Sequence, residues 1–263
     1  MLWRSSTLIG YGIRATDGAL GSIVDLLIDD QDWTVRWAVV DTGNWFPGRR
    51  VLLPAHVLGE PDSAVREFPV DLTRQQVNDS PDTATDQPVS RQMEVDLYSH
   101  YGWAPYWGAG SLAYPGYLPT GPAVIPPAGG VPDPRLGARA PDGAAEVSDA
   151  ERGDPHLRSA TEVTGYYVHA TDQHIGHVEE FLIDSATWQV RYVVVDTKNW
   201  WPGRKVMVST RWFRDIDWGE REVHVDLTRE QVRSSPEFDQ AAPIERDYEE
   251  RLHGHYGQRI PWI

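Results

Sequence analysis

The chain has 263 residues, with 24 lysines and arginines against 39 aspartates and glutamates, so its formal net charge is 24 − 39 = −15. This excess argues against a nucleic acid or an anionic membrane surface as the main partner, because both are bound mainly through lysine and arginine. The lack of cysteine excludes disulfides, thiolate zinc sites, iron–sulfur clusters and a cysteine nucleophile. No apolar stretch has the length of a signal peptide core or a spanning helix, so we expect a soluble, cytoplasmic protein without stable membrane insertion.

The sequence is an internal duplication. A shift of 155 residues aligns 7–102 with 162–257 without a gap, and 41 of the 96 paired positions are identical. A repeat of this length has the size of a small domain rather than of a solenoid unit. Segment 104–143 holds 17 prolines and glycines in 40 positions, which is typical of an extended linker. We therefore expect copy one at 1–103, a linker at 104–158 and copy two at 159–263.

Short runs rich in β-branched and aromatic residues predict the strands of each copy. They lie at 20–30, 35–41, 49–54 and 68–72 in copy one, and at 175–185, 190–196, 204–209 and 223–227 in copy two. Several short strands separated by turn signals indicate a small antiparallel barrel or sandwich. The fold class that we expect is therefore all-β.

An aromatic turn separates the second and third predicted strands of each copy, as DTGNWFPGRR at 41–50 and DTKNWWPGRK at 196–205. Pro-Gly fits the central pair of a type II turn, whereas large aromatic side chains are unusual there. Aromatic residues and arginine are enriched at binding hot spots. We predict that these turns bind a partner or pair the two copies, and a lid over the barrel end remains a third interpretation. The candidate residues are Asn44, Trp45, Phe46, Arg49, Asn199, Trp200, Trp201 and Arg204.

Two helices are predicted to end each copy. Thr73 with Gln76, and Thr228 with Gln231, have the spacing of a capping box at the start of a short helix. In the following segment, apolar residues recur every fourth position on one helical face, with charged residues on the other. We expect this stripe to pack on its own barrel or on the other copy. Its members include Met93, Leu97 and Tyr101 in copy one, and Tyr248, Leu252 and Tyr256 in copy two, after Val89 and Ile244.

Repeated carboxylates are the main candidates for chemistry: Asp29 and Asp184, Asp41 and Asp196, Asp71 and Asp226. A carboxylate pair is suited to acid–base catalysis, but aspartates at strand ends more commonly cap turns or pair with arginine. Three histidines, His169, His174 and His177, gather in copy two only, where copy one has Arg14, Ala19 and Ser22. Their spacing matches no common zinc pattern. We therefore predict no catalytic residue, no metal and no cofactor.

The pattern Ala15-Thr16-Asp17-Gly18, Gly21, Asp29, Val35-Arg36 and Val39-Val40-Asp41 recurs in copy two as Ala170-Thr171-Asp172, Gly176, Asp184, Val190-Arg191 and Val194-Val195-Asp196. This pattern resembles the PRC-barrel domain, a family that includes the cytoplasmic domain of the photosynthetic reaction-centre H subunit and stand-alone bacterial proteins. The resemblance implies two tandem antiparallel β-barrels of about six strands each, followed here by short helices. It also implies an adaptor role without shared catalytic residues.

These observations favour a non-enzymatic adaptor or assembly protein. Its two barrels would pair within the chain and bind a protein partner of unknown identity, and a homo-oligomer remains open. One alternative is an accessory subunit that supports a membrane electron-transfer or photosynthetic complex. Another is a metal- or small-molecule-dependent enzyme that uses the repeated aspartates.

Overall fold

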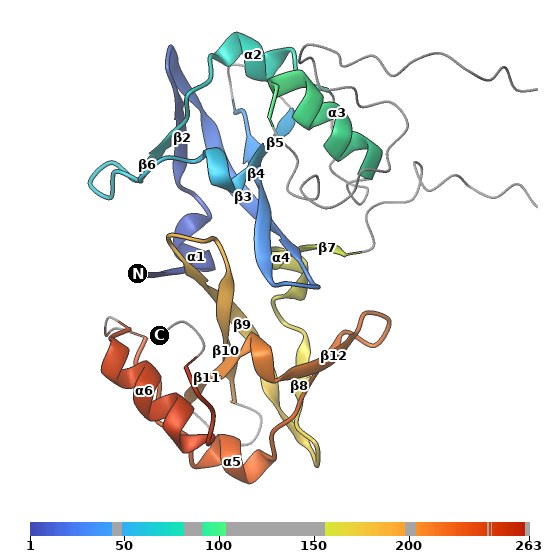
Figure 1. The fold of residues 1–263 in the computed structure, drawn as a ribbon, viewed down its shortest axis with the longest axis vertical. Coiled ribbons are helices and arrows are strands. Elements are labelled where there is room, and N and C mark those ends of the chain that lie inside the picture. The colour runs from blue at the N-terminus through green and yellow to red at the C-terminus, as the bar shows by residue number, and fades with distance from the viewer. Residues whose placement is uncertain are drawn as a thin grey trace, which may run out of the picture.

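The computed structural model describes residues 1–43, 49–81, 91–103, 156–197, 204–240, 242 and 244–260, and Figure 1 shows the two copies as stacked halves. Copy one contains β1 (Leu2–Arg4), α1 (Ser5–Leu8), β2 (Gly12–Ala15), β3 (Gly18–Asp29), β4 (Thr34–Asp41), β5 (Arg50–Pro54), the 3-10 turn η1 (Ala55–Val57), β6 (Glu67–Pro69), α2 (Arg74–Asn78) and α3 (Arg91–Tyr101). Copy two contains β7 (Leu157–Ser159), α4 (Ala160–Val163), β8 (Tyr167–His169), β9 (His174–Asp184), β10 (Val190–Asp196), β11 (Lys205–Ser209), η2 (Thr210–Trp212), β12 (Phe213–Asp217), β13 (Glu222–Val225), α5 (Arg229–Arg233) and α6 (Arg246–His255).

The fold is mostly β, as the sequence predicts. The prediction of two closed, fully antiparallel barrels is wrong. The strands of copy one follow the order β5-β4-β3-β2-β6, those of copy two β11-β10-β9-β8-β13-β12, and within the described residues neither path closes on itself. Each sheet also holds one parallel pair, β2 with β6 and β8 with β13. Copy one has no counterpart of β12 in its described part, because the matching segment contains Gly59 and Pro61. Proline has no N–H to donate to a ladder, so strand pairing is interrupted there.

The first strand of each copy pairs with the long strand of the other copy. β1 lies antiparallel to β9 with Leu2 opposite Asp184, and β7 lies antiparallel to β3 with Leu157 opposite Asp29. These two registers are equivalent under the 155-residue shift. In Figure 1 the N-terminal segment β1–α1 accordingly lies beside the sheet of copy two, and β7–α4 beside the sheet of copy one. The chain is therefore an intramolecular, strand-exchanged pair with approximate two-fold symmetry.

The turns between the long strands complete this contact between the copies. Trp33 and Trp188 adopt φ angles of 58° and 59°, a left-handed conformation that is strained for a bulky residue. Their carbonyl oxygens accept hydrogen bonds across the pseudo-two-fold axis, from the N–H of Val190 at 2.7 Å and of Val35 at 2.9 Å. The cross-copy hydrogen bonds and the burial of the Trp188 ring, which is 7% exposed, offset the strain.

One hydrophobic core runs through both copies. At the contact, the Trp3 ring lies 5.6 Å from Phe68 in its own copy and 5.5 Å from Trp188 in the other, both edge-on. On the opposite side of the axis, Trp33 meets Phe213 edge-on at 5.0 Å. Aromatic pairs with this geometry contribute about 0.5–1.5 kcal/mol beyond the burial of their area. The two copies therefore share a core instead of touching through their surfaces.

Candidate interaction site

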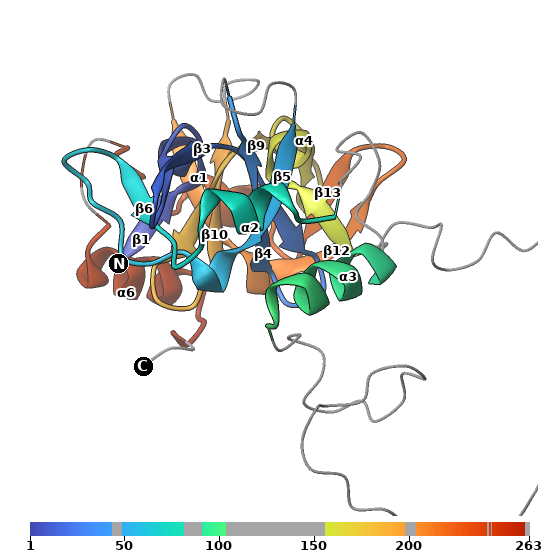
Figure 2. The same cartoon turned by 90° about the horizontal axis from the view of Figure 1, so that it is seen from above.

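The aromatic turns connect β4 to β5 and β10 to β11. Arg49 and Arg204, which directly precede the return strands, lie inside the described residues. The other candidates of the turns lie outside them: Asn44, Trp45, Phe46, Asn199, Trp200 and Trp201. The base of each turn is closed in the same way. The hydroxyl groups of Thr42 and Thr197 each donate at 2.7 Å to the carbonyl oxygen of the arginine opposite. In Figure 2 the ends of both hairpins point to the same side of the molecule.

Each arginine ties its hairpin to the following helical turn. The Arg49 guanidinium donates to the carbonyl oxygens of Asn78 and Ser80, at the end of α2. The Arg204 guanidinium donates to the carbonyl oxygen of Ser235, the counterpart of Ser80. The unsatisfied carbonyls at a helix end are favourable acceptors for a cation. The predicted turn residues Arg49 and Arg204 therefore act at the base, where they anchor the hairpins.

The short helices start as the sequence predicts. Thr73 accepts a hydrogen bond from the Gln76 N–H while the Gln76 side chain accepts from the Thr73 N–H, and Thr228 with Gln231 repeats the arrangement. The capping boxes are thus confirmed in both copies. They fix the helix ends to which the arginines bind.

The striped helices α3 and α6 pack on the outer faces of the sheets. Leu97 and Leu252 are fully buried. Met93 and Tyr101 contact a small core made by Trp37, Val39, Leu52, Leu97, Tyr98 and Leu157. Leu157 belongs to β7, so α3 packs on its own sheet and on the exchanged strand together.

The tyrosines of the stripe reach the same place as the hairpin arginines. Burial raises the pKa of Tyr101, while the nearby Ser80 and Arg49 act in the opposite direction. In copy two, burial raises the pKa of Tyr256 to about 12, with Ser235 and Arg204 opposing it. The structure therefore gathers, in each copy, one predicted turn residue and one predicted stripe residue around the same buried serine. Tyr248 lies about two helical turns before Tyr256, and its hydroxyl donates to the Pro236 carbonyl oxygen at 3.1 Å.

A buried glutamate on each of these helices is absent from the sequence-based candidates. Glu94 is fully buried and accepts a hydrogen bond from the Trp37 indole N–H at 2.8 Å. Its counterpart Glu249 accepts from the Tyr192 hydroxyl at 3.0 Å. Burial and the Glu249 carboxylate raise the pKa of Tyr192, so its hydroxyl stays protonated and donates. The apolar stripe predicts charged residues on the solvent face of the helix, whereas both of these glutamates are buried. The signal that could have found them is the repeat itself, which retains glutamate at this position in both copies.

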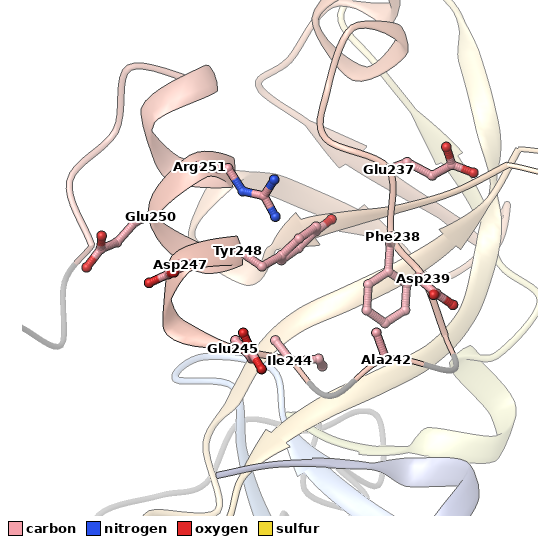
Figure 3. A pocket seen from close by; sticks show the side chains of 10 residues that line it. All are labelled: Glu237, Phe238, Asp239, Ala242, Ile244, Glu245, Asp247, Tyr248, Glu250 and Arg251. Carbon is pink, nitrogen blue, oxygen red and sulfur yellow. The ribbon is translucent and has the colours of Figure 1, made fainter.

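A groove of about 1020 Å³ lies between α6 and the segment that precedes it (Figure 3). Its aromatic floor is formed by Phe238 and Tyr248, whose ring centroids are 6.1 Å apart. Figure 3 shows the Arg251 side chain above Tyr248, and its guanidinium lies 5.8 Å from that ring centroid. The remaining lining is strongly acidic: Glu237, Asp239, Glu245, Asp247 and Glu250. The chemistry of this groove favours a cationic side chain over an anion.

The repeated aspartates occupy structural positions. Asp29 accepts from the Gln31 N–H at 3.0 Å and forms an ion pair with Arg36 at 3.1 Å. Burial acts to raise the pKa of Asp184, but the N–H groups of Ala186 and Thr187 and the Arg191 guanidinium together lower it below its ordinary value. Asp41 accepts from the Gly43 N–H at 2.8 Å.

These carboxylates also lie far apart. Asp29 pairs with Thr34 at the start of β4, whereas Asp41 is at the other end of that strand, opposite Ser22. A strand of this length spans about 20–25 Å. Asp29 and Asp41 therefore do not form a carboxylate pair. Asp71 and Asp226 are exposed.

One cluster has the composition of a metal site. The ligating atoms of His169, His174 and Glu222 lie within 4.8 Å of one another. His177 is on the same strand as His174, opposite Tyr167, and is not part of this group.

The comparison with known families agrees with the repeat. The profile of the PRC-barrel domain matches residues 3–74 and again 155–232. The protein therefore belongs to the PRC-barrel family and carries the domain twice. A protein of Deinococcus radiodurans described as uncharacterized is 31% identical over 83 residues, which cover 32% of this chain and 29% of that protein. The match spans less than a third of that relative.

Proposed function

We propose that this protein is a non-enzymatic adaptor in which two PRC-barrel copies, locked together by strand exchange, present their aromatic turns as a paired binding surface for a protein partner. The observation that carries this proposal is the matched anchoring of the two hairpins. Thr42 with Arg49, and Thr197 with Arg204, close the bases of both hairpins by the same contacts, and the described ends of the two hairpins lie on the same side of the molecule (Figure 2). Two equivalent sites on one rigid body favour a bivalent or symmetric partner, because the second contact forms at a high effective concentration.

Partner capture tests this proposal. The full chain is immobilised, exposed to lysate of the source organism, and the retained proteins are quantified by mass spectrometry. We expect one defined partner, and we expect Trp45→Ala with Trp200→Ala to lower its recovery at least tenfold. Each single variant should retain part of the binding, because one turn remains.

The control is Val65→Ala, which shortens a side chain that is 60% exposed in the segment before β6. It should leave recovery unchanged, and thermal unfolding should show that all variants are folded. Equal recovery with the double variant and the wild-type chain would contradict the proposal and make the aromatic turns structural.

The alternative of an accessory subunit for a membrane complex has less support. Across the described ranges, no helix is long and apolar enough to cross a membrane. The enzyme alternative needs gathered carboxylates, whereas Asp29 and Asp41 lie at opposite ends of β4. The adaptor proposal accounts for the repeated turns, and neither alternative does.

A further inference from the structure

Three histidines form a row across neighbouring strands of copy two. The sheet places β8 between β9 and β13. His169 on β8 lies opposite His174 on β9 and, on its other side, opposite His224 on β13. Residues that are directly opposite in adjacent strands point to the same face, with Cβ atoms about 4.5–5.5 Å apart. The register therefore brings together histidines that are up to 55 positions apart in the sequence, since 224 − 169 = 55.

The row has the geometry of a partly assembled metal site. The Nε2 atoms of His169 and His174 are 3.0 Å apart. Two imidazole ligands on a tetrahedral Zn²⁺, with Zn–N bonds of about 2.0–2.1 Å, place their nitrogens about 3.3–3.4 Å apart. A carboxylate oxygen of Glu222 lies within 4.8 Å of one ring nitrogen of each of these histidines. A shift of a few tenths of an ångström therefore brings the two imidazoles to the spacing of zinc ligands, and a rotation of the Glu222 side chain that moves its oxygen closer by up to about 1.4 Å completes the ligand set.

The remaining histidine is placed to orient the carboxylate. His224 Nδ1 lies 2.5 Å from Asp215 Oδ1, and its Nε2 lies 3.6 Å from Glu222 Oε2. Asp215 thereby holds the His224 ring beside Glu222, and a group that contacts a ligating carboxylate in this way helps to fix its orientation. His174 is exposed, which leaves the site open to solvent.

In copy one, the equivalent strands carry other residues at the three positions of the histidine row. The counterparts of His169, His174 and His224 are Arg14, Ala19 and Pro69, in the same registers. Arg14 forms an ion pair at 2.6 Å with Glu67, the counterpart of Glu222. A fixed cation on the protein therefore occupies, in copy one, the place beside the carboxylate that copy two leaves to a pair of imidazoles.

We propose that copy two binds one late first-row divalent metal ion, of the class of Zn²⁺, through His169, His174 and Glu222. Imidazole with a single carboxylate is the ligand set that suits Zn²⁺, Cu²⁺ and Ni²⁺ rather than Mg²⁺ or Ca²⁺. In the structure, one imidazole Nε2 donates to the other, and metal binding at both Nε2 atoms requires the donor ring to carry its proton on Nδ1 instead. This proposal departs from the sequence-based prediction of no metal, for which the linear spacing of the histidines was the main argument.

Calorimetric titration of the full chain, prepared without a polyhistidine tag, with ZnCl₂ tests the site. We expect saturable binding of one Zn²⁺ per chain, and Co²⁺ should give the visible absorption bands of tetrahedral coordination. The key variant combines His169→Arg with His174→Ala. It gives copy two the residues of copy one, and the new arginine can pair with Glu222 as Arg14 pairs with Glu67, so the fold should persist while the binding is lost.

Two further variants separate a designed site from surface histidines. His224→Ala should weaken Zn²⁺ binding about 10–100-fold, because the carboxylate loses its orientation. His255→Ala, which changes an exposed histidine on α6, should leave it unchanged. The same stoichiometry and affinity in the wild-type chain and in the His169→Arg/His174→Ala variant, or no saturable binding by the wild-type chain, would overturn the proposal.

Discussion

Single residues determine how closely the long strands approach the neighbouring backbone. A Cβ atom on Gly21 would lie 2.0 Å from the Asp41 carbonyl oxygen, and one on Gly176 would lie 2.1 Å from that of Asp196. Both glycines also have positive φ angles, 157° and 142°. No side chain fits at these positions without moving backbone, so the repeated glycine of the sequence pattern is a packing requirement in both copies.

Gly21→Ala should therefore lower the free energy of unfolding by about 2 kcal/mol or more, because it adds left-handed strain to a clash with backbone. Urea-induced unfolding measures the change. Gly254→Ala is the matched control, because nothing lies within 4 Å of its added Cβ and alanine favours a helix. If Gly21→Ala were as stable as Gly254→Ala, the described close approach would be wrong.

A buried histidine predicts a pH dependence of stability. Burial lowers the pKa of His253 below 6.5, with Arg211 also lowering it and the Arg259 backbone raising it. His253 Nε2 lies 2.9 Å from the Tyr192 hydroxyl, and the ring packs on Trp212. Because the unfolded chain then binds more protons than the folded chain, stability is greatest above pH 6.5 and falls as the pH decreases toward the lowered pKa.

The decrease should not exceed about 1.4 kcal/mol per pH unit for this one group. Unfolding midpoints between pH 7.5 and 5 measure it. His253→Gln keeps a side-chain donor for Tyr192 without titrating in this range, so the variant should lose stability less steeply than the wild-type chain. The same slope in both proteins would show that His253 is not the responsible group.

At the scale of elements, the short strand β1 matters more than its three residues suggest. Ser5, directly after it, accepts from the Phe181 N–H through its hydroxyl at 3.0 Å, and the Ser6 hydroxyl donates to Glu180 at 2.6 Å. β7 and α4 repeat this arrangement, where Thr161 donates through N–H and hydroxyl to Asp25. Each entry segment is thus fixed by side chains of the copy that it does not belong to.

Trp3→Ala should destabilise the whole chain by about 3 kcal/mol, because the indole packs against Phe68 in one copy and Trp188 in the other. Urea-induced unfolding followed by circular dichroism measures the loss. Val65→Ala, at an exposed position, should stay within about 0.5 kcal/mol of the wild-type chain. A loss for Trp3→Ala no larger than that of Val65→Ala would mean that β1 is not docked.

Local pattern predicts most of these elements but not their partners. The strand at 190–196 matches β10, and the capping boxes at Thr73 and Thr228 are present. The exchange of β1 and β7 was not predictable, because both copies carry the same pattern and local periodicity does not state which long strand a short strand joins. β7 begins at Leu157, before the expected boundary of copy two, so the domain limits remain a prediction.

The residues of the candidate sites were also predictable only in part. The anchoring residues Arg49 and Arg204 stand out in sequence because the repeat marks them, whereas the aromatic residues beyond them lie outside the described structure. The sequence places His169 and His174 near each other, but it missed His224 and Glu222, which join them only through the register of three strands. Buried Glu94 was missed because a carboxylate in a helix normally faces solvent.

At the scale of the whole molecule, the two copies of the domain pair within one chain as the subunits of a dimer would. The approximate symmetry gives two equivalent hairpins, two equivalent helices that pack on the sheets, and one shared hydrophobic core. The departures from symmetry are local: β12 and the histidine row occur in copy two only in the described residues. The duplication therefore gives the two copies a common fold and a shared core, and the differences between the copies give each one a distinct surface.

Strand exchange joins the two copies, and a disulfide crosslink tests it most directly. The chain contains no cysteine, so a pair of introduced cysteines can crosslink only with each other. Ser159 on β7 lies opposite Leu27 on β3 of the other copy. Opposite residues of an antiparallel pair have Cα atoms about 4.5–5.5 Å apart, which suits a disulfide. The variant Leu27→Cys with Ser159→Cys should therefore form an intramolecular disulfide on mild oxidation, seen as a monomer of shifted mobility on a non-reducing gel. The matched variant Leu27→Cys with Arg4→Cys places the second thiol where an unexchanged β1 would lie, and it should not crosslink; the opposite outcome, a disulfide with position 4 and none with position 159, would contradict the exchange.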